Sequence, residues 1–188
     1  MNLLKQSLIL SCALSFFTAL PVSAADIAAG EQKASACIGC HGQKGSSSNA
    51  QWPNLAGHPA AYLANQLKAF KAGDRINVMM QSMTANLSTE DIDNLAAYFS
   101  SQKPAKAGGD AALAKAGEAK AGMCLGCHGA KAEGNGQFPR LAGQHPAYLE
   151  QQLKAFKDGS RKSGPMQATA ANLSEEDMQA LAAYFGSL

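Results

Sequence analysis

Two pentapeptides of the same form, Cys-x-x-Cys-His, constrain this chain more than any other feature. They occupy residues 37–41 and 124–128. Two cysteines three positions apart lie about one helical turn from each other, so their thiols can reach neighbouring edges of one planar group while the next residue turns its imidazole beneath it. This pattern is the attachment signature of a c-type haem, in which two thioethers fix the porphyrin and the histidine ligates the iron.

Other uses of paired cysteines explain these motifs less well. A thioredoxin-like pair needs a βαβ context, and the sequence has no alternating β-branched runs. A zinc site made by the four cysteines, or two disulfides, would leave the following histidines without a role. The sequence therefore predicts two covalently bound haem c groups. The predicted attachment residues are Cys37, Cys40 and His41 for the first haem, and Cys124, Cys127 and His128 for the second.

The N-terminus predicts export. Lys5 precedes a mostly apolar stretch, residues 6–20, and small residues follow at 21–24, as in a secretory signal and its cleavage site. We expect residues 1–24 to be a cleaved signal peptide and the mature protein to be periplasmic, where c-type haem is attached. An uncleaved anchor is the alternative, although the stretch is shorter than the ~20 residues of a membrane span. Cleavage at Cys12, as in a lipoprotein, is a remote third.

Charge excludes one class of partner. Of 16 lysines and arginines one lies in the signal, which leaves 15 against 14 acidic residues, and neither half of the chain is strongly biased. Nucleic-acid binding requires a basic face, so the sequence gives it no support.

The rest of the chain is one unit written twice. Trp52-Pro53-Asn54-Leu55-Ala56-Gly57 after the first motif matches Phe138-Pro139-Arg140-Leu141-Ala142-Gly143 after the second. Further matched segments follow at the same spacing, 86 residues apart, up to 95–99 and 181–185. The sequence predicts two domains, residues 25–102 and 111–188, joined by a short linker at 103–110. Each is small for an independent core, and a covalently held macrocycle can fill much of it.

The local pattern within each unit is helical. Three helices are expected per unit: 26–36, 59–71 and one that begins near Ser88, with 111–123, 146–157 and one near Ser174 as their counterparts. Gly73 and Gly159 suit helix ends. The sequences after Ser88 and Ser174 resemble N-capping boxes. We therefore predict an all-α fold with long loops.

A six-coordinate iron needs a second ligand, and methionine is the best candidate. Met80 and Met166 each stand seven residues before a repeated leucine, and no other methionines are equivalent in the two units. We predict that they complete the two sites, although a shift by one residue to Met79 stays open. Met79 and Met83 are expected near the ring as flexible filler, and Met123 and Met178 as packing residues. His58 and His145 are not equivalent to each other and are expected at the surface.

With the paired motifs, the paired P-x-L-A-G segments, the two methionines before A-N-L-S and the two L-A-A-Y-F segments, the mature chain resembles the dihaem cytochrome c4 family. The resemblance covers residues 25–188. It implies two class I cytochrome c domains related by a pseudo-twofold axis. It also implies that Pro53 and Pro139 match the proline whose carbonyl supports the proximal histidine.

The expected function is therefore that of an electron carrier and not of an enzyme, since both irons have two protein ligands. The resemblance implies redox protein partners, a respiratory donor and a terminal oxidase, with loose membrane association at most; we expect a monomer. The alternatives are a dihaem enzyme, such as a peroxidase or a sulfur-compound dehydrogenase, and the haem subunit of a larger enzyme. No acid/base pair near an open site favours the enzyme.

Overall fold

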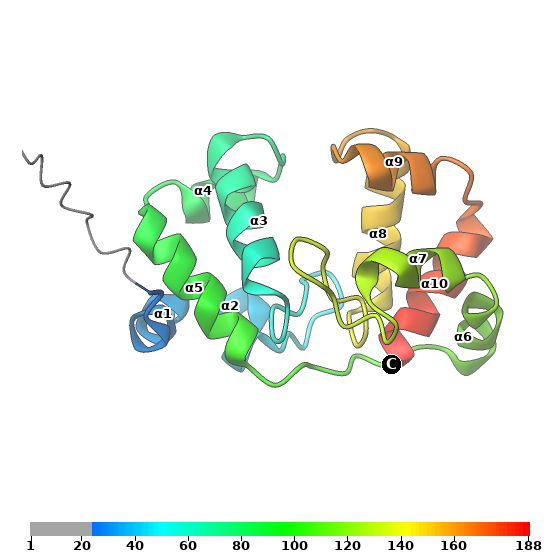
Figure 1. The fold of residues 1–188 in the computed structure, drawn as a ribbon, viewed down its shortest axis with the longest axis horizontal. Coiled ribbons are helices and arrows are strands. Elements are labelled where there is room, and N and C mark those ends of the chain that lie inside the picture. The colour runs from blue at the N-terminus through cyan, green and yellow to red at the C-terminus, as the bar shows by residue number, and fades with distance from the viewer. Residues whose placement is uncertain (1–23) are drawn as a thin grey trace, which may run out of the picture.

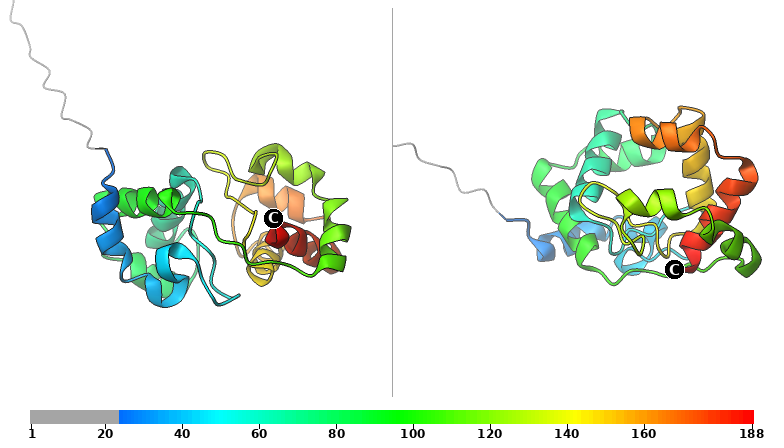
Figure 2. Two further views of the ribbon diagram at one scale, coloured as in Figure 1. Left: turned by 90° about the horizontal axis from the view of Figure 1, so that it is seen from below. Right: turned by 45° about the vertical axis from the view of Figure 1, so that its right-hand side comes forward.

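The computed structural model describes residues 24–188, and the predicted signal lies outside this range except for Ala24. Figure 1 shows two helical halves joined by one extended segment at their base, and Figure 2 shows the same division from two further sides. The first half contains α1 (Ile27–Ala34), α2 (Ile38–His41), the 3₁₀ helix η1 (Gln43–Gly45), α3 (Ala60–Ala72), α4 (Val78–Thr84) and α5 (Thr89–Ser101). The second contains α6 (Ala111–Glu118), α7 (Gly122–His128), α8 (Pro146–Lys157), α9 (Gly164–Ala170) and α10 (Glu175–Ser187). Within residues 24–188 there is no strand, only an isolated bridge between Asn135 and Phe138, so the all-α prediction is confirmed.

Each half is built on one crossed helix pair. α1 packs against α5, and α6 against α10. Glycine allows the close crossing: a Cβ at Gly30 would lie 2.2 Å from the carbonyl oxygen of Asn94, and one at Gly117 would lie 2.0 Å from that of Ala180. α3 and α8 pack on the same long helices, α5 and α10, and each contacts the short helix that follows it. The arrangement is thus repeated along with the sequence.

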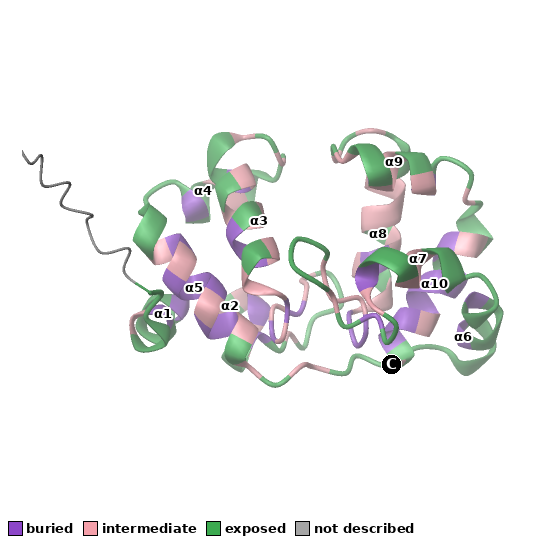
Figure 3. Cartoon of the chain, viewed as in Figure 1, coloured by how far each residue is buried: buried purple, intermediate pink, exposed green. Residues whose placement is uncertain are grey.

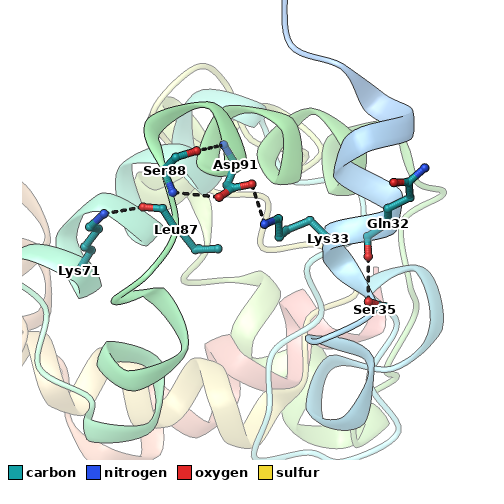
Figure 4. A network of polar contacts seen from close by, with 7 residues as sticks. All are labelled: Gln32, Lys33, Ser35, Lys71, Leu87, Ser88 and Asp91. Carbon is teal, nitrogen blue, oxygen red and sulfur yellow. Dashed lines mark hydrogen bonds and ion pairs between the residues drawn. The ribbon is translucent and has the colours of Figure 1, made fainter.

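The long helices begin at capping boxes, as predicted. Figure 4 shows the first: Ser88 accepts a hydrogen bond from the Asp91 backbone, and Asp91 accepts one from the Ser88 backbone. Asp91 also pairs with Lys33 of α1 at 2.9 Å, and Lys71 of α3 donates to the carbonyl of Leu87. Ser174 and Asp177 repeat the box in the second half. One cap therefore ties α1 and α3 to the start of α5.

The two cores are small and contain few large side chains. Figure 3 shows that the buried positions gather along α5 and α10, with exposed residues on the outer helices. The first core cluster consists of Ala34, Leu63, Ala64, Ile92, Leu95, Ala96, Tyr98 and Phe99. The second consists of Ala121, Ala132, Ala142, Leu149, Leu181, Ala182 and Phe185. This economy matches the expectation that a macrocycle completes each core.

The prediction of three helices per unit is wrong. The structure adds α4 and α9, which carry the candidate methionines, and puts each Cys-x-x-Cys-His motif on a short helix of its own. These added segments span four to seven residues, too short for a helical period to emerge from sequence. Gly73 caps α3 in a left-handed conformation, as expected, whereas Gly159 follows the Asp158 cap of α8.

The segment between α5 and α6 lies against the second half. The backbone of Ala107 donates to the carbonyl of Gly143 (3.1 Å), and that of Gly108 to Gly186 (2.9 Å). A Cβ at Gly143 would lie 2.1 Å from the carbonyl oxygen of Ala105, so this contact also depends on glycine. No helix within residues 24–188 has the length and apolarity needed to cross a bilayer.

Candidate haem sites

The histidine of each motif is buried and held in one orientation. His41 and His128 are 8% and 5% exposed. Nδ1 of His41 lies 2.9 Å from the carbonyl oxygen of Pro53, and Nδ1 of His128 lies 2.8 Å from that of Pro139. Since a carbonyl only accepts, each Nδ1 carries the proton and Nε2 keeps its lone pair. The expectation that the two prolines support the histidines is confirmed.

Electrostatics keeps these imidazoles in the form that binds a metal. Burial lowers the pKa of His41 and His128, although the hydrogen bond to the proline carbonyl acts in the opposite direction. Both rings are therefore neutral at pH 7. A neutral imidazole with a fixed Nδ1–H is the usual metal ligand, and such outer hydrogen bonds set its orientation and basicity.

The four cysteines are free thiols and lie as two separate pairs. Cys37, Cys40 and Cys124 are half-buried, and Cys127 is exposed. Burial raises the pKa of Cys37 and Cys124, and for Cys37 the neighbouring Cys40 adds to the effect. No group of three or more His, Cys, Asp or Glu side chains in residues 24–188 is placed to hold a metal ion. The donor set of each half, two thiols and one oriented imidazole, fits a covalently attached haem.

The candidate methionines occupy matching places. Met80 is the third residue of α4, and Met166 is the third residue of α9. Both are half-buried, whereas Met79 is 56% exposed. Met83 is 45% exposed. The structure thus gives the two sequence-equivalent methionines equivalent positions, and it favours Met80 over Met79 by burial.

Two of the remaining methionines were expected to pack in the protein. Met178 is 1% exposed, as expected for a core residue. Met123 is 67% exposed, so that expectation is wrong for this side chain. Met123 directly precedes Cys124 in α7, and no packed helix covers that side of the turn.

The surface prediction is also wrong for His58. This side chain is 6% exposed, and its Nδ1 has no hydrogen-bond partner. It lines a cavity of about 10 Å³ together with Asn54, Arg140, Gln144 and backbone of both halves. Burial lowers the pKa of His58 to about 4; the backbone of Asn54 opposes this shift and the charge of Arg140 adds to it.

The partner of His58 is the residue at the same place in the other unit. Gln144 stands 86 positions later, and its Nε2 lies 3.5 Å from Nε2 of His58. Gln144 also holds Asn54 from both sides: Oε1 accepts from the Asn54 backbone (2.8 Å) and Nε2 donates to the Asn54 carbonyl (2.9 Å). His145, expected at the surface, is half-buried and bonds to the carbonyl of Ser47 (3.0 Å). The failed repeat test marked both histidines, but only the docking of the halves buries them.

The comparisons with known proteins agree on both halves of the chain. The family model described as Cytochrome c matches residues 27–103 and again 114–188. Cytochrome c4 of Pseudomonas aeruginosa is 38% identical over the full length of both chains. The thiosulfate dehydrogenase electron acceptor of Thiomonas intermedia is 38% identical over 92% of this chain and 86% of its own. The crystal structure of reduced recombinant cytochrome c4 from Pseudomonas stutzeri has a TM-score of 0.82 and 39% identity, covering 88% of this chain and all of that one.

Two all-α units, each with an oriented histidine beside a free pair of cysteines, define a tandem c-type cytochrome. Such a protein carries two covalently bound haem c groups, one per domain. The full-length similarity narrows the class: the chain belongs to the cytochrome c4 family. It is accordingly an electron-transfer protein that works with redox partners.

Proposed function

We propose that this protein carries single electrons through two irons that are each held between a histidine and a methionine. The proposed ligands are His41 and Met80 for the first iron, and His128 and Met166 for the second. The proposed attachment residues are Cys37, Cys40, Cys124 and Cys127. The observation that carries the proposal is the paired geometry: a proline-bonded histidine and a half-buried methionine in the third position of a short helix, in both halves.

The chain's residues prepare the sites in two ways. The bound haem supplies a one-electron couple. The proline carbonyls hold each imidazole so that no ligand has to reorganise when the charge changes, and thioether ligation favours the reduced state. With both axial positions taken by protein side chains, neither site has a place for a substrate.

We further propose a periplasmic location, with residues 1–24 as a cleaved signal, residues 25–102 and 111–188 as the two domains and 103–110 as their linker. The respiratory chain is the proposed setting, with a terminal oxidase as acceptor. A second setting is favoured by the relative from Thiomonas intermedia, which is named as an electron acceptor of thiosulfate dehydrogenase. In that case the electrons come from a sulfur-compound dehydrogenase.

An absorption spectrum of the purified protein tests ligation first. We expect two low-spin haems per chain and no spectral change when carbon monoxide is added to the reduced form. Carbon monoxide binding to either haem would mean an open iron and would favour the enzyme. Stopped-flow reduction by thiosulfate dehydrogenase with thiosulfate, compared with a quinol-oxidising membrane fraction, separates the two settings.

A further inference from the structure

Two arginines meet at the boundary between the domains, where α3 and α8 face each other (Figure 1). Arg75 and Arg161 are 86 residues apart and are therefore repeat equivalents. We call the group that they form with their hydrogen-bond partners the arginine cluster. It consists of Tyr62, Gln66 and Arg75 of the first domain and Tyr148, Gln152 and Arg161 of the second.

Each arginine reaches into the opposite domain. Arg75 donates to Gln66 of its own domain (2.7 Å), and to Tyr148 (2.9 Å) and Gln152 (2.8 Å) across the boundary. Arg161 mirrors these bonds. It donates to Gln152 (2.7 Å) in its own domain, and to Tyr62 (3.3 Å) and Gln66 (2.9 Å) across the boundary. The cluster is thus reciprocal.

The cluster contains two positive charges and no counter-ion. Every acceptor is a neutral amide or phenol oxygen, and none of the five ion pairs found in residues 24–188 involves an arginine. Oε1 of Gln66 accepts from both arginines, so nitrogens of the two guanidinium groups come within about 6 Å of each other. Both groups are half-buried, and each stacks on a ring, Phe70 or Phe156, at 4.6 and 4.5 Å.

Like charges this close, partly removed from water, are unfavourable unless an anion lies between or beside them. The neighbouring phenol registers the positive field: burial alone would raise the pKa of Tyr148, yet the charges of Arg75 and Arg161 lower it below its ordinary value. A guanidinium has five N–H donors, and each arginine uses only three bonds here. Donors are therefore left for a carboxylate, the anion that a guanidinium fork fits.

The position of the cluster indicates which carboxylates are within reach. Arg75 stands five residues before Met80, and Arg161 five residues before Met166. Each arginine is therefore part of the segment that leads into a proposed iron ligand. A haem carries two propionate carboxylates, and the chain must neutralise or expose them.

We propose that Arg75 and Arg161 form one carboxylate-binding site across the domain boundary, which takes a propionate of each haem. The proposal rests on the proposed haem ligation and goes beyond it. Because each guanidinium bonds to both domains, the site is shared, and a change at either arginine acts on both haems. The shared site makes the two reduction potentials depend on the same pair of charges.

The test uses the haem-loaded protein and the variants Arg75→Gln, Arg161→Gln and Arg161→Lys. A matched control is Lys162→Gln, which removes the same charge from an exposed side chain one residue away. We expect each glutamine variant to lower both reduction potentials and to make them depend on pH near neutrality, since a carboxylate without its guanidinium takes up a proton more readily. The lysine variant should keep part of both effects, and the control should change neither.

Three results separate the possibilities. Potentials that move in only one domain, or that move equally in the Lys162 control, would overturn the shared site. Dependence of the wild-type potentials on added acetate or phosphate, lost in the glutamine variants, would assign the site to a free anion and overturn the haem assignment. If the variants do not fold, a crystal structure of the wild-type haem-loaded protein decides: no propionate oxygen within hydrogen-bond distance of either guanidinium overturns the proposal. Failure of the proposed function appears separately, as carbon monoxide binding in the wild type.

Discussion

Replacing His58 by glutamine should remove a specific part of the acid sensitivity of this protein. Glutamine is the residue that the second domain has at the equivalent position, Gln144. His58 is buried at the boundary, next to Arg140 and against the ring of Tyr62, whose centroid is 5.2 Å away. A proton on this ring therefore has no water and a cation nearby, so the folded state resists protonation.

The magnitude follows from the pKa. Burial, opposed by the Asn54 backbone and aided by Arg140, lowers the pKa of His58 from 6.5 to about 4. Between these values the unfolded chain binds a proton that the folded chain does not, so stability is lost as the pH falls through this window. One pKa unit corresponds to about 1.4 kcal/mol, which gives a loss of about 3 kcal/mol between pH 7 and about pH 4. The His58→Gln variant should lack this loss.

Guanidinium unfolding of the haem-loaded protein measures the effect. Trp52 is the only tryptophan and belongs to the same domain as His58, so its fluorescence reports that domain. His145→Gln is the control, because it removes the other histidine outside the motifs, which can also bind iron in the unfolded chain. We expect it to keep the wild-type dependence on pH. Equal acid losses in wild type and His58→Gln would refute the reasoning.

Three further predictions concern the sites and the frame. Met80→Ala and Met166→Ala should each open one haem to carbon monoxide and leave the other unchanged in the absorption spectrum, whereas Met79→Ala should open neither; binding in the Met79 variant would move the ligand by one residue. Ser174→Ala removes the cap of α10 and should lower the free energy of unfolding by about 1 kcal/mol in thermal denaturation; an unchanged midpoint would contradict the cap. Gly143→Ala should destabilise the domain boundary by more than about 1–2 kcal/mol, because its φ of 76° is strained for alanine and its Cβ would meet the Ala105 carbonyl oxygen at 2.1 Å. Gly136→Ala, with φ of 56° and open space around it, carries the strain alone; equal losses of stability in the two glycine variants would contradict the contact.

Most of what lies inside one domain could be predicted from the sequence. The Cys-x-x-Cys-His spacing and the repeat gave the class, and the capping boxes marked the starts of α5 and α10. The equivalence of Met80 and Met166 was read from spacing alone, and the structure puts both in the same helical position. These features are local, so a short stretch of chain determines them. The short helices α4 and α9 were missed because seven residues do not show a period.

Contacts between the domains escaped prediction for a different reason. A repeat specifies two similar units, but a pseudo-twofold boundary places each residue beside its own equivalent, a relation that no spacing along the chain expresses. At this boundary the repeat is kept in one place and broken in another. Arginine faces arginine in the cluster, which concentrates charge and demands a shared anion, whereas His58 faces Gln144, which lets one amide reach across to Asn54 and leaves one imidazole buried without a partner. The symmetric position thus couples the two domains, and the asymmetric one makes their contact sensitive to acid.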